Sequence, residues 1–271
     1  MKREDVKVCV LRVGGTNCDA ETKRSLVELG VQAEIVHANE IISHQNLMEY
    51  NAVVFPGGFS YGDHVRAGVI WAKRILARLG EELKAFIEDN RPILGICNGF
   101  QVLVEAGVLP GFEGISPYPE AALATNLPSN YNCRWIHIKH ENKGNCIFTR
   151  NIHKDKVFRI PVAHSQGRFM FTKEKEKQYL TRLYKNDQLV FRYCDKNGEY
   201  AEGRFPTNPN GSFHDIAGIC NPEGTIFGLM PHPERAFYWW QQPDWTKQEK
   251  MHQYGDGKLI FEGLVNYLEN S

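Results

Sequence analysis

A cysteine flanked by glycines is the residue of this sequence best suited to do chemistry. Cys97 lies in Gly95-Ile96-Cys97-Asn98-Gly99, at the end of the apolar run Pro92–Ile96. This pattern is typical of a nucleophile elbow, in which a strand ends, the chain turns sharply and a helix starts at once. The flanking small residues let strand and helix pack closely, and the positive end of the helix favours thiolate over thiol. The pattern predicts a nucleophilic thiol exposed above a sheet.

A histidine and a glutamate far along the chain could serve this nucleophile. His232 and Glu234 lie in Met230-Pro231-His232-Pro233-Glu234, after another apolar strand. In an extended chain both side chains point the same way, so Glu234 could hold the ring while the other ring nitrogen faces the thiol. A lone cysteine or histidine is more often structural, but together the three residues predict a Cys97–His232–Glu234 triad. His-x-Glu could instead hold a metal ion, although no third ligand with metal spacing is evident.

An acyl-transfer site also needs hydrogen-bond donors aimed at the developing oxyanion. The segment Pro56–Asp63 follows the apolar strand Ala52–Phe55, and its adjacent Gly57 and Gly58 let backbone N–H groups approach a ligand closely. The N–H of Asn98, directly after the nucleophile, is the natural second donor. As a phosphate loop this segment would be poor, because it has neither Gly-Lys-Ser/Thr nor G-x-G-x-x-G.

The composition is that of an ordinary globular protein. The 271 residues are 42% apolar and 24% charged, enough to bury a sizeable core. Basic and acidic residues both number 32, so the net charge is zero and a nucleic-acid partner is not expected. Seven scattered cysteines form no C-x-x-C pair, and neither a signal peptide nor a membrane-spanning run is evident. We therefore expect free thiols and a cytoplasmic location.

Apolar runs and helical spacing alternate as far as Pro110, and they predict a parallel sheet covered on both faces. The expected strands are Val6–Val13, Ala33–Val36, Ala52–Phe55 and Pro92–Ile96. The expected helices are Asp19–Leu29, Val65–Asn90 (with a break near Gly80) and Asn98–Ala106, and Ile41–Tyr50 is a short helix or loop.

Beyond Pro110 the pattern favours an antiparallel extension. Residues 111–130 are expected to form a loop, and the expected strands are Cys133–Lys139, Val157–Val162, Leu189–Tyr193, Ile216–Cys220 and Thr225–Leu229. The last two flank a turn at Asn221–Gly224. Lys173–Lys177 is a solvated loop or a helix start, residues 238–256 are an aromatic and polar insertion, and Leu259–Leu268 is a closing helix. No linker is present, so residues 1–271 are predicted to form one α/β domain.

Several of these segments together resemble the class I (triad) glutamine amidotransferase family. The elbow and Pro-His-Pro-Glu carry the family resemblance. Six segments also occur in the order found in the branch that serves phosphoribosylformylglycinamidine synthase in purine synthesis: Asn17–Asp19, Pro56–Asp63, Gly95–Gln101, Pro161–His164, Asn208–Ser212 and Met230–Arg235. The resemblance implies a flavodoxin-like fold with a central, mostly parallel sheet flanked by helices.

The resemblance also implies an activity and further site residues. Cys97 would hydrolyse L-glutamine through a thioester, and Gly58 and Asn98 would form the oxyanion hole. Gln101 and His164 would bind glutamine, although His164 could equally be a structural residue at a strand end. The ammonia would pass to a synthetase subunit, with or without a small adaptor subunit. That synthetase would use ATP and Mg to convert formylglycinamide ribonucleotide to the amidine, and no cofactor is expected in this chain.

The chain departs from the family in one segment. Where the family usually reads histidine-glycine-glutamate-glycine, this chain has His164-Ser165-Gln166-Gly167. Two other classes of function also remain open. A cysteine peptidase or other thiol hydrolase on the same fold would use the same Cys-His-Glu chemistry, but it would need an open cleft. A non-catalytic scaffold or regulator would typically lack one member of the triad, and none is missing here.

Overall fold

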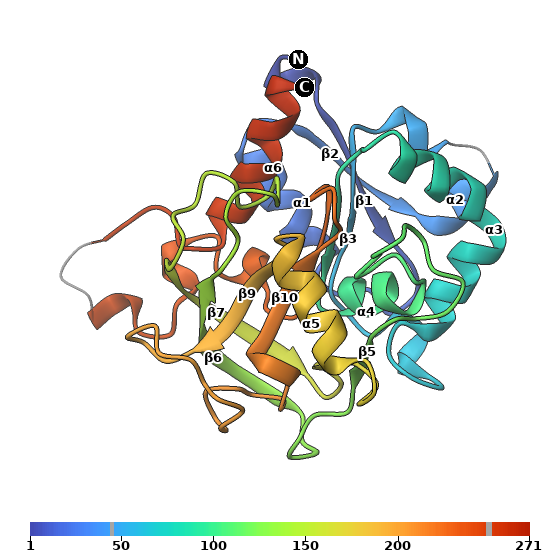
Figure 1. The fold of residues 1–271 in the computed structure, drawn as a ribbon. Coiled ribbons are helices and arrows are strands. Elements are labelled where there is room, and N and C mark those ends of the chain that lie inside the picture. The colour runs from blue at the N-terminus through green and yellow to red at the C-terminus, as the bar shows by residue number, and fades with distance from the viewer. Residues whose placement is uncertain (44–45, 248–250) are drawn as a thin grey trace.

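A nine-stranded sheet runs through the molecule in the order β2-β1-β3-β4-β11-β10-β9-β6-β7 (Figure 1). The structure is a computed structural model and describes residues 1–43, 46–247 and 251–271. The strands are β1 (Lys7–Arg12), β2 (Gln32–His37), β3 (Ala52–Phe55), β4 (Ile93–Ile96), β6 (Asn132–His140), β7 (Val157–His164), β9 (Leu189–Cys194), β10 (Ile216–Cys220) and β11 (Ile226–Leu229).

One half of the sheet is parallel. β2, β1, β3, β4 and β11 pair in parallel, and every residue of β3, β4 and β11 is buried, because these strands are apolar and covered on both faces. The helices of this half are α1 (Asp19–Glu28), α2 (Ala38–Ser43), α3 (Val69–Glu88), α4 (Asn98–Glu105) and α6 (Lys258–Asn270). α1 packs with α6, and α3 packs with α4, on the other side of β1 and β3 in Figure 1.

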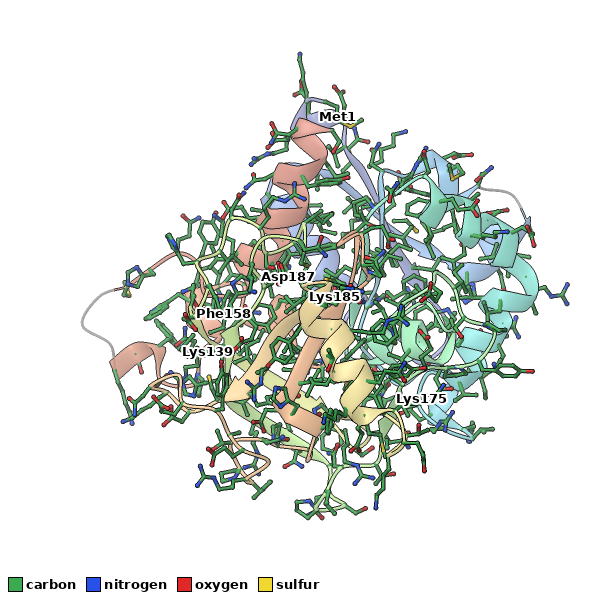
Figure 2. All side chains as sticks on the ribbon, viewed as in Figure 1. Met1, Lys139, Phe158, Lys175, Lys185 and Asp187 are labelled. Atoms are coloured by element: carbon green, nitrogen blue, oxygen red, sulfur yellow. The ribbon has the colours of Figure 1, made fainter. Side chains whose placement is uncertain are left out.

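The other half is antiparallel. β10, β9, β6 and β7 pair in alternating directions, and along β7 fully buried residues alternate with partly exposed ones. A second, two-stranded sheet pairs β5 (Ala122–Ala124) with β8 (Arg168–Met170). The helix α5 (Glu176–Lys185) lies over this half, with Lys175 and Lys185 labelled at its two ends in Figure 2.

The predicted fold class is confirmed, with a parallel half and an antiparallel extension joined by the β10–β11 hairpin. The turn of that hairpin closes with a bond from the Gly224 N–H to the Asn221 carbonyl (3.0 Å). Lys173–Lys177 includes the start of α5, the second of its two expected structures.

Two predictions of local structure are wrong. The long helix begins at Val69 rather than Val65, because Val65 and Gly68 have left-handed backbone (φ 72° and 78°), and it is unbroken at Gly80. A side chain at Gly80 would meet nothing within 4 Å, so this glycine lies in open space, where it costs a helix only about 1 kcal/mol. The expected loop 111–130 contains β5, because a three-residue strand is too short to show a period.

The aromatic segment contacts both α1 and the edge strand β7, where the Arg159 guanidinium donates to Gln242 (3.2 Å) and Asp244 (2.7 Å). Its described part forms two short turns, Trp239–Gln241 and Trp245–Lys247, while residues 248–250 lie outside the described chain. Tyr238 and Trp240 stack with ring centroids 4.4 Å apart, and the Tyr254 hydroxyl donates to Glu28 of α1 (3.0 Å). The segment therefore lies against one helix and one edge strand, and Trp240 keeps half of its surface exposed.

Candidate active site

The residues expected to do chemistry meet at the carboxyl ends of neighbouring parallel strands. β4 and β11 are paired so that Ile96 lies opposite Leu229, and Cys97 and Met230 follow directly. The turn after β3 reaches the same edge, as does the turn after β1, because the Thr16 and Gly58 backbones pair there. Loops at the carboxyl ends of parallel strands are where α/β sheets build their sites.

Cys97 has the strained backbone of a nucleophile elbow. Its φ and ψ are 50° and −102°, and the helix α4 starts at the next residue. The Cys97 N–H donates to the Leu229 carbonyl (2.8 Å), which ties the elbow to β11. Gly99 is required here, because a Cβ at this position would lie 1.9 Å from the Phe55 carbonyl oxygen. The predicted close approach of strand and helix is therefore present.

The expectation that the Cys97 thiol is exposed is wrong. Only 4% of Cys97 is accessible, and its Sγ lies 3.8 Å from the Ala163 carbonyl oxygen. Ala163 belongs to β7, so the antiparallel half covers the nucleophile.

His232 and Glu234 form a buried pair next to the elbow. His232 Nδ1 lies 2.5 Å from Glu234 Oε1, and the His232 N–H donates to the Pro161 carbonyl (2.9 Å). The chain between them is not extended as predicted, since Pro233–Arg235 form one helical turn. This helical turn, rather than an extended chain, places the Glu234 carboxylate next to the His232 ring.

The charges around His232 favour its protonated form. Burial lowers the pKa of His232, but the negative charges of Glu234 and Cys97 outweigh burial and raise the pKa well above its usual value. Within the described chain the His232 Nε2 atom is buried and has no hydrogen-bond partner. With Nδ1 held by Glu234, this free nitrogen is the one that can exchange a proton with a reacting group.

Two backbone N–H groups beside Cys97 are unpaired. Among the described residues, neither Gly58 nor Asn98 donates a backbone hydrogen bond. The Asn98 side chain joins the two segments, since its Oδ1 accepts from the Ser60 N–H (3.3 Å). Gly58 has a φ of 154°, and a Cβ there would lie 2.7 Å from the Asn17 nitrogen and the Gly15 oxygen. In the described chain both N–H groups are unpaired, and their role as oxyanion donors stays a prediction.

Gln101 is held by protein groups on both sides. Its Oε1 accepts from the Asn98 amide (2.9 Å), and its Nε2 donates to the Gln166 carbonyl. The Gln166 side chain in turn accepts from the Ala67 N–H (3.0 Å). The neutral residue that replaces the family's usual glutamate therefore links α4 to the segment before α3.

His164 lies in a clamp of asparagines. Its Nδ1 lies 3.2 Å from Asn126 Oδ1, and its Nε2 lies 3.5 Å from Asn210 Nδ2. Burial, with the nearby charge of His232, lowers the pKa of His164 to about 3. Both ring nitrogens face protein partners, so these contacts favour the structural alternative for His164 over a substrate contact.

Three further residues matter that the sequence did not assign. Asn126 and Asn210 hold His164, and Cys18 lies 3.9 Å from His232 Nδ1. Asn210 and Cys18 lie in segments that carry the family resemblance, which was the available signal. Their contacts join residues far apart in the sequence, so spacing alone could not find them.

Cys18, His232 and Glu234 bring three candidate metal-ligand atoms within 4.8 Å of one another. The Arg235 guanidinium donates to Cys18 Sγ at 3.1 Å, so a permanent positive charge lies next to that sulfur. A cation would have to displace this charge and separate His232 from Glu234. The contacts among these residues are therefore better described as the acid–base pair His232–Glu234 with Cys18 packed beside it.

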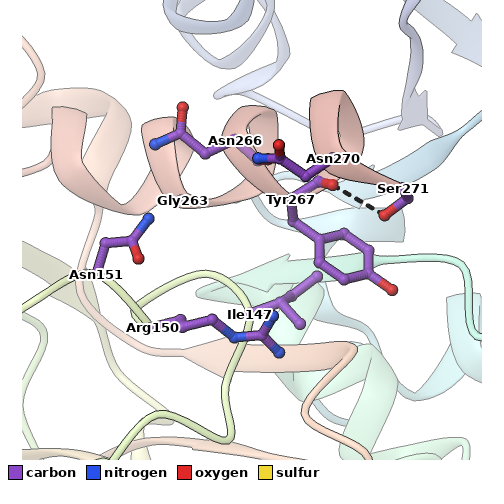
Figure 3. Close-up of a pocket in the computed structure, with 8 residues that line it drawn as sticks. All are labelled: Ile147, Arg150, Asn151, Gly263, Asn266, Tyr267, Asn270 and Ser271. Carbon is purple, nitrogen blue, oxygen red and sulfur yellow. Dashed lines mark hydrogen bonds between the residues drawn. The ribbon is translucent and has the colours of Figure 1, made fainter. Parts of the chain in front are cut away.

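A cavity of about 200 Å³ lies apart from this site, between α6 and the loop at residues 147–151 (Figure 3). Its polar lining comes from Arg150, Asn151, Asn266 and Asn270. None of its lining residues is a cysteine, histidine, aspartate or glutamate, so the cavity offers no thiol, imidazole or carboxylate side chain. In the described part of the chain, no helix is long and apolar enough to cross a membrane.

Comparisons with known proteins agree with this geometry. Residues 5–268 match the model of the CobB/CobQ-like glutamine amidotransferase domain. The chain is 49% identical to the phosphoribosylformylglycinamidine synthase subunit PurQ of Archaeoglobus fulgidus, over 99% of each chain. It is 42% identical to the protein of the same name from Methanococcus maripaludis strain S2, over 97% of this chain and 94% of that one.

Solved structures show the same similarity. A chain of PurLQS from Thermotoga maritima matches with a TM-score of 0.72 and 31% identity, over 97% of this chain and 99% of that chain. A putative GMP synthase protein from Thermoplasma acidophilum matches with a TM-score of 0.54 and 18% identity, over 98% and 94%, which shows a shared fold alone.

Proposed function

We propose that this chain, which belongs to the CobB/CobQ-like glutamine amidotransferase family, is the glutaminase subunit of a phosphoribosylformylglycinamidine synthase. The observation that carries the proposal is the meeting of Cys97, the His232–Glu234 pair and two unpaired backbone N–H groups at one sheet edge. A nucleophile, an oriented base and oxyanion donors are the parts that acyl transfer requires.

The reaction proceeds through a thioester. The Cys97 thiolate attacks the side-chain amide carbon of glutamine, and the N–H groups of Gly58 and Asn98 stabilise the oxyanion that forms. His232 gives a proton from Nε2 to the leaving nitrogen, and the C–N bond breaks to release ammonia. Water, deprotonated by His232, then attacks the γ-glutamyl thioester, releasing glutamate and the free thiol. Glu234 keeps the ring in the required tautomer throughout.

The ammonia is used by a second subunit. In that synthetase Mg-ATP would activate the glycinamide carbonyl oxygen of formylglycinamide ribonucleotide, and ammonia would replace that oxygen to give the amidine, while the formyl group is unchanged. The similarity to a chain of PurLQS supports an assembly with a synthetase, with or without a small adaptor subunit. Glutamine is the substrate of this chain, which itself needs no cofactor for the proposed steps. We place the complex in the cytoplasm, where the free thiols would stay reduced.

Binding of the partner opens the site. Cys97 is covered, and beside it the segment Phe59–Gly68 has left-handed backbone at Tyr61, Gly62 and Asp63. Strained backbone of this kind costs about 1–3 kcal/mol per residue and persists only where its surroundings hold it. We infer that contact with the synthetase reshapes Gly57–Asp63 and admits glutamine, so that little ammonia is released without the partner.

The experiment is the release of glutamate from glutamine by this chain, with and without the synthetase, Mg-ATP and formylglycinamide ribonucleotide. We expect strong stimulation by the partner, and no glutamate from Cys97→Ala. The Cys97→Ala complex should still make the amidine from free ammonium, because the synthetase site is intact. Equal turnover with and without the partner would contradict the gating, and loss of both activities in Cys97→Ala would contradict the division of roles.

A cysteine peptidase is the alternative reading of the same triad. A peptide chain needs an open cleft at the nucleophile, and Cys97 is 96% covered. Glutamate release absent under every condition, together with cleavage of peptide substrates, would favour that reading.

A further inference from the structure

Cys18 is the second cysteine at the site, and all of its polar groups are occupied. Its N–H donates to the Gly57 carbonyl (3.0 Å), and its own carbonyl accepts from the Thr22 hydroxyl (2.6 Å). Its Sγ lies 3.9 Å from His232 Nδ1 and accepts from the Arg235 guanidinium (3.1 Å). Only 1% of Cys18 is accessible. A residue fixed in this way has one position, set by the turn after β1.

The Cys18 sulfur and Gly57 together confine one edge of the His232 ring. A Cβ on Gly57 would lie 2.7 Å from His232 Cε1, 3.3 Å from its Nδ1 and 3.2 Å from Cys18 Sγ. The ring edge, the sulfur and the glycine are therefore in mutual contact. The ring has no room to turn toward Gly57 or Cys18, and its Nδ1 stays directed at Glu234.

The backbone of the same turn holds the base of the loop that carries the oxyanion donor. The Asn17 and Cys18 N–H groups both donate to the Gly57 carbonyl, and the Phe59 N–H donates to the Gly15 carbonyl (2.8 Å). Gly58 lies between these bonds. The segment Gly15–Cys18 thus contacts the histidine through a side chain and the Gly58 donor through its backbone.

We propose that Cys18 is a positioning residue for the glutaminase reaction, whose sulfur holds the His232 ring on Glu234 while its backbone holds Gly57 under the oxyanion loop. The inference rests on the proposed function and adds a residue to it. Cys18 does not touch the reacting carbon, and it acts only through His232 and Gly57.

The charge arrangement explains why a thiol suits this place. Burial raises the pKa of Cys18 more than His232 and Arg235 lower it, so the group stays a neutral thiol. The polarizable sulfur can accept from the Arg235 guanidinium, as a weak acceptor, without adding a negative charge beside Glu234. Arg235 is also 3.6 Å from Glu21 of α1, which anchors the guanidinium. Cys18 therefore separates the Arg235 cation from the ring that must take up and release a proton.

The test compares Cys18→Ala and Cys18→Ser with Cys9→Ala, measured in the complex with the synthetase. Cys9 is also a fully buried cysteine, but it lies inside β1 away from the histidine, so it controls for loss of a buried sulfur. The readouts are kcat, KM for glutamine, the pH profile of kcat/KM, and the melting temperature.

For Cys18→Ala we expect kcat to fall by about 10- to 100-fold with little change in KM, which is at most the lower end of the contribution of general acid–base catalysis, because His232 itself remains. The alkaline limb of the pH profile of kcat/KM reports loss of the His232 proton. This limb should move to lower pH, because the Cys18 contact helps to raise the pKa of His232. The groups facing His232 are Cys97, Glu234 and Cys18, with Arg235 behind the sulfur and the neutral His164 nearby. Cys18→Ser should recover part of kcat, because it restores an acceptor for Arg235.

Unchanged kcat and pH profile in Cys18→Ala would overturn the inference, and so would a loss no larger than that of Cys9→Ala at equal melting temperature. If Cys18→Ala fails to fold, Cys18→Val, which fills the space of the sulfur without an acceptor for Arg235, takes its place, and wild-type kcat with an unshifted profile in Cys18→Val would overturn the inference equally. A wild-type complex that releases no glutamate would refute the proposed function itself, and the positioning role with it. Active wild type with an unaffected Cys18→Ala refutes the positioning role alone.

Discussion

Among the described residues, the turns at the carboxyl ends of the parallel strands leave buried polar groups unpaired around the nucleophile, whereas the asparagine-rich loop at residues 208–212 of the antiparallel half pairs the groups of its side chains. At the parallel edge, the described contacts leave His232 Nε2, Glu234 Oε2 and Ser60 Oγ without a partner. In the antiparallel half, the Asn208 side chain alone donates to Ser212 and Asp215 and accepts from three backbone N–H groups. Unpaired groups are costly when buried, and they are retained where a ligand will pair with them.

The same contrast holds for two buried histidines. His232 in the parallel half has a raised pKa, because burial is outweighed by Glu234 and Cys97. His164 in the antiparallel half has a pKa lowered to about 3 by burial, among neutral asparagines. A histidine beside a carboxylate is prepared for proton transfer, and one among amides is prepared to stay neutral.

The largest effect should come from Glu234→Gln, which keeps the shape of the pair but removes its charge. We expect kcat to fall by about 10³- to 10⁴-fold, because the amide no longer fixes the tautomer of His232 or stabilises its protonated form. Steady-state glutamate release in the complex measures this. Glu223→Gln is the control, since Glu223 lies in the β10–β11 turn. A loss below tenfold would mean that Glu234 does not orient the ring.

A smaller loss should follow Gly58→Ala. The added Cβ would lie 2.7 Å from two backbone atoms of the turn after β1, so the Gly58 N–H must move. Loss of one oxyanion donor costs about 10²- to 10³-fold in kcat. Gly14→Ala is the matched control, because its Cβ would meet nothing within 4 Å. Equal kcat values for the two variants would contradict the assignment of Gly58 to the oxyanion hole.

In the antiparallel half, Asn210→Ala should reduce stability rather than chemistry. The Asn210 amide donates to the Gly167 carbonyl (2.8 Å) and the Tyr193 hydroxyl (3.1 Å), and it accepts from Ser212 (3.0 Å). Leaving these buried groups unpaired should lower the free energy of unfolding by about 2 kcal/mol. Urea unfolding measures this, with the exposed Asn130→Ala as control. A large fall in kcat at unchanged stability would place Asn210 in the reaction instead.

The last effect, which is absent at neutral pH, is the pH dependence of stability due to His164. Because its folded pKa is about 3, unfolding takes up a proton between pH 6.5 and 3, so stability rises with pH in that window and is lost as pH falls. The slope from this one group approaches about 1.4 kcal/mol per pH unit. His164→Gln should flatten the acid limb of the stability curve, and the exposed His153→Gln should not. Identical slopes would show that His164 can protonate in the folded protein.

In both halves the sequence predicts the longer strands and helices well, and it predicts the short or irregular segments poorly. The strand before Cys97 and the helix after it are predicted to within a residue, because an apolar run, two glycines and a helix follow one another locally. β5 and β8 have three residues each, which is too short to show a period. The left-handed path through Tyr61–Asp63 could not be predicted, because contacts from the turn after β1 hold it.

Within the site, residue types were predictable and their surroundings were not. The sequence brings Cys97, His232 and Glu234 together as a triad by chemical type, and the structure places His232 Nδ1 2.5 Å from Glu234 Oε1. The cover over Cys97 comes from Ala163, and the clamp on Gln101 comes from Gln166. Each of these contacts joins residues more than sixty positions apart, and such distant contacts leave no periodic signal in the chain.

The position of β11 also affects how the chain is made. This strand, near the end of the sequence, lies in the interior of the sheet between β4 and β10. During translation the edge of β4 next to Cys97 stays unpaired until residues 226–229 have left the ribosome. Until then a half-built sheet presents an open strand edge, which invites pairing with other chains. The nucleophile therefore gains its histidine only when β11 is inserted between β4 and β10.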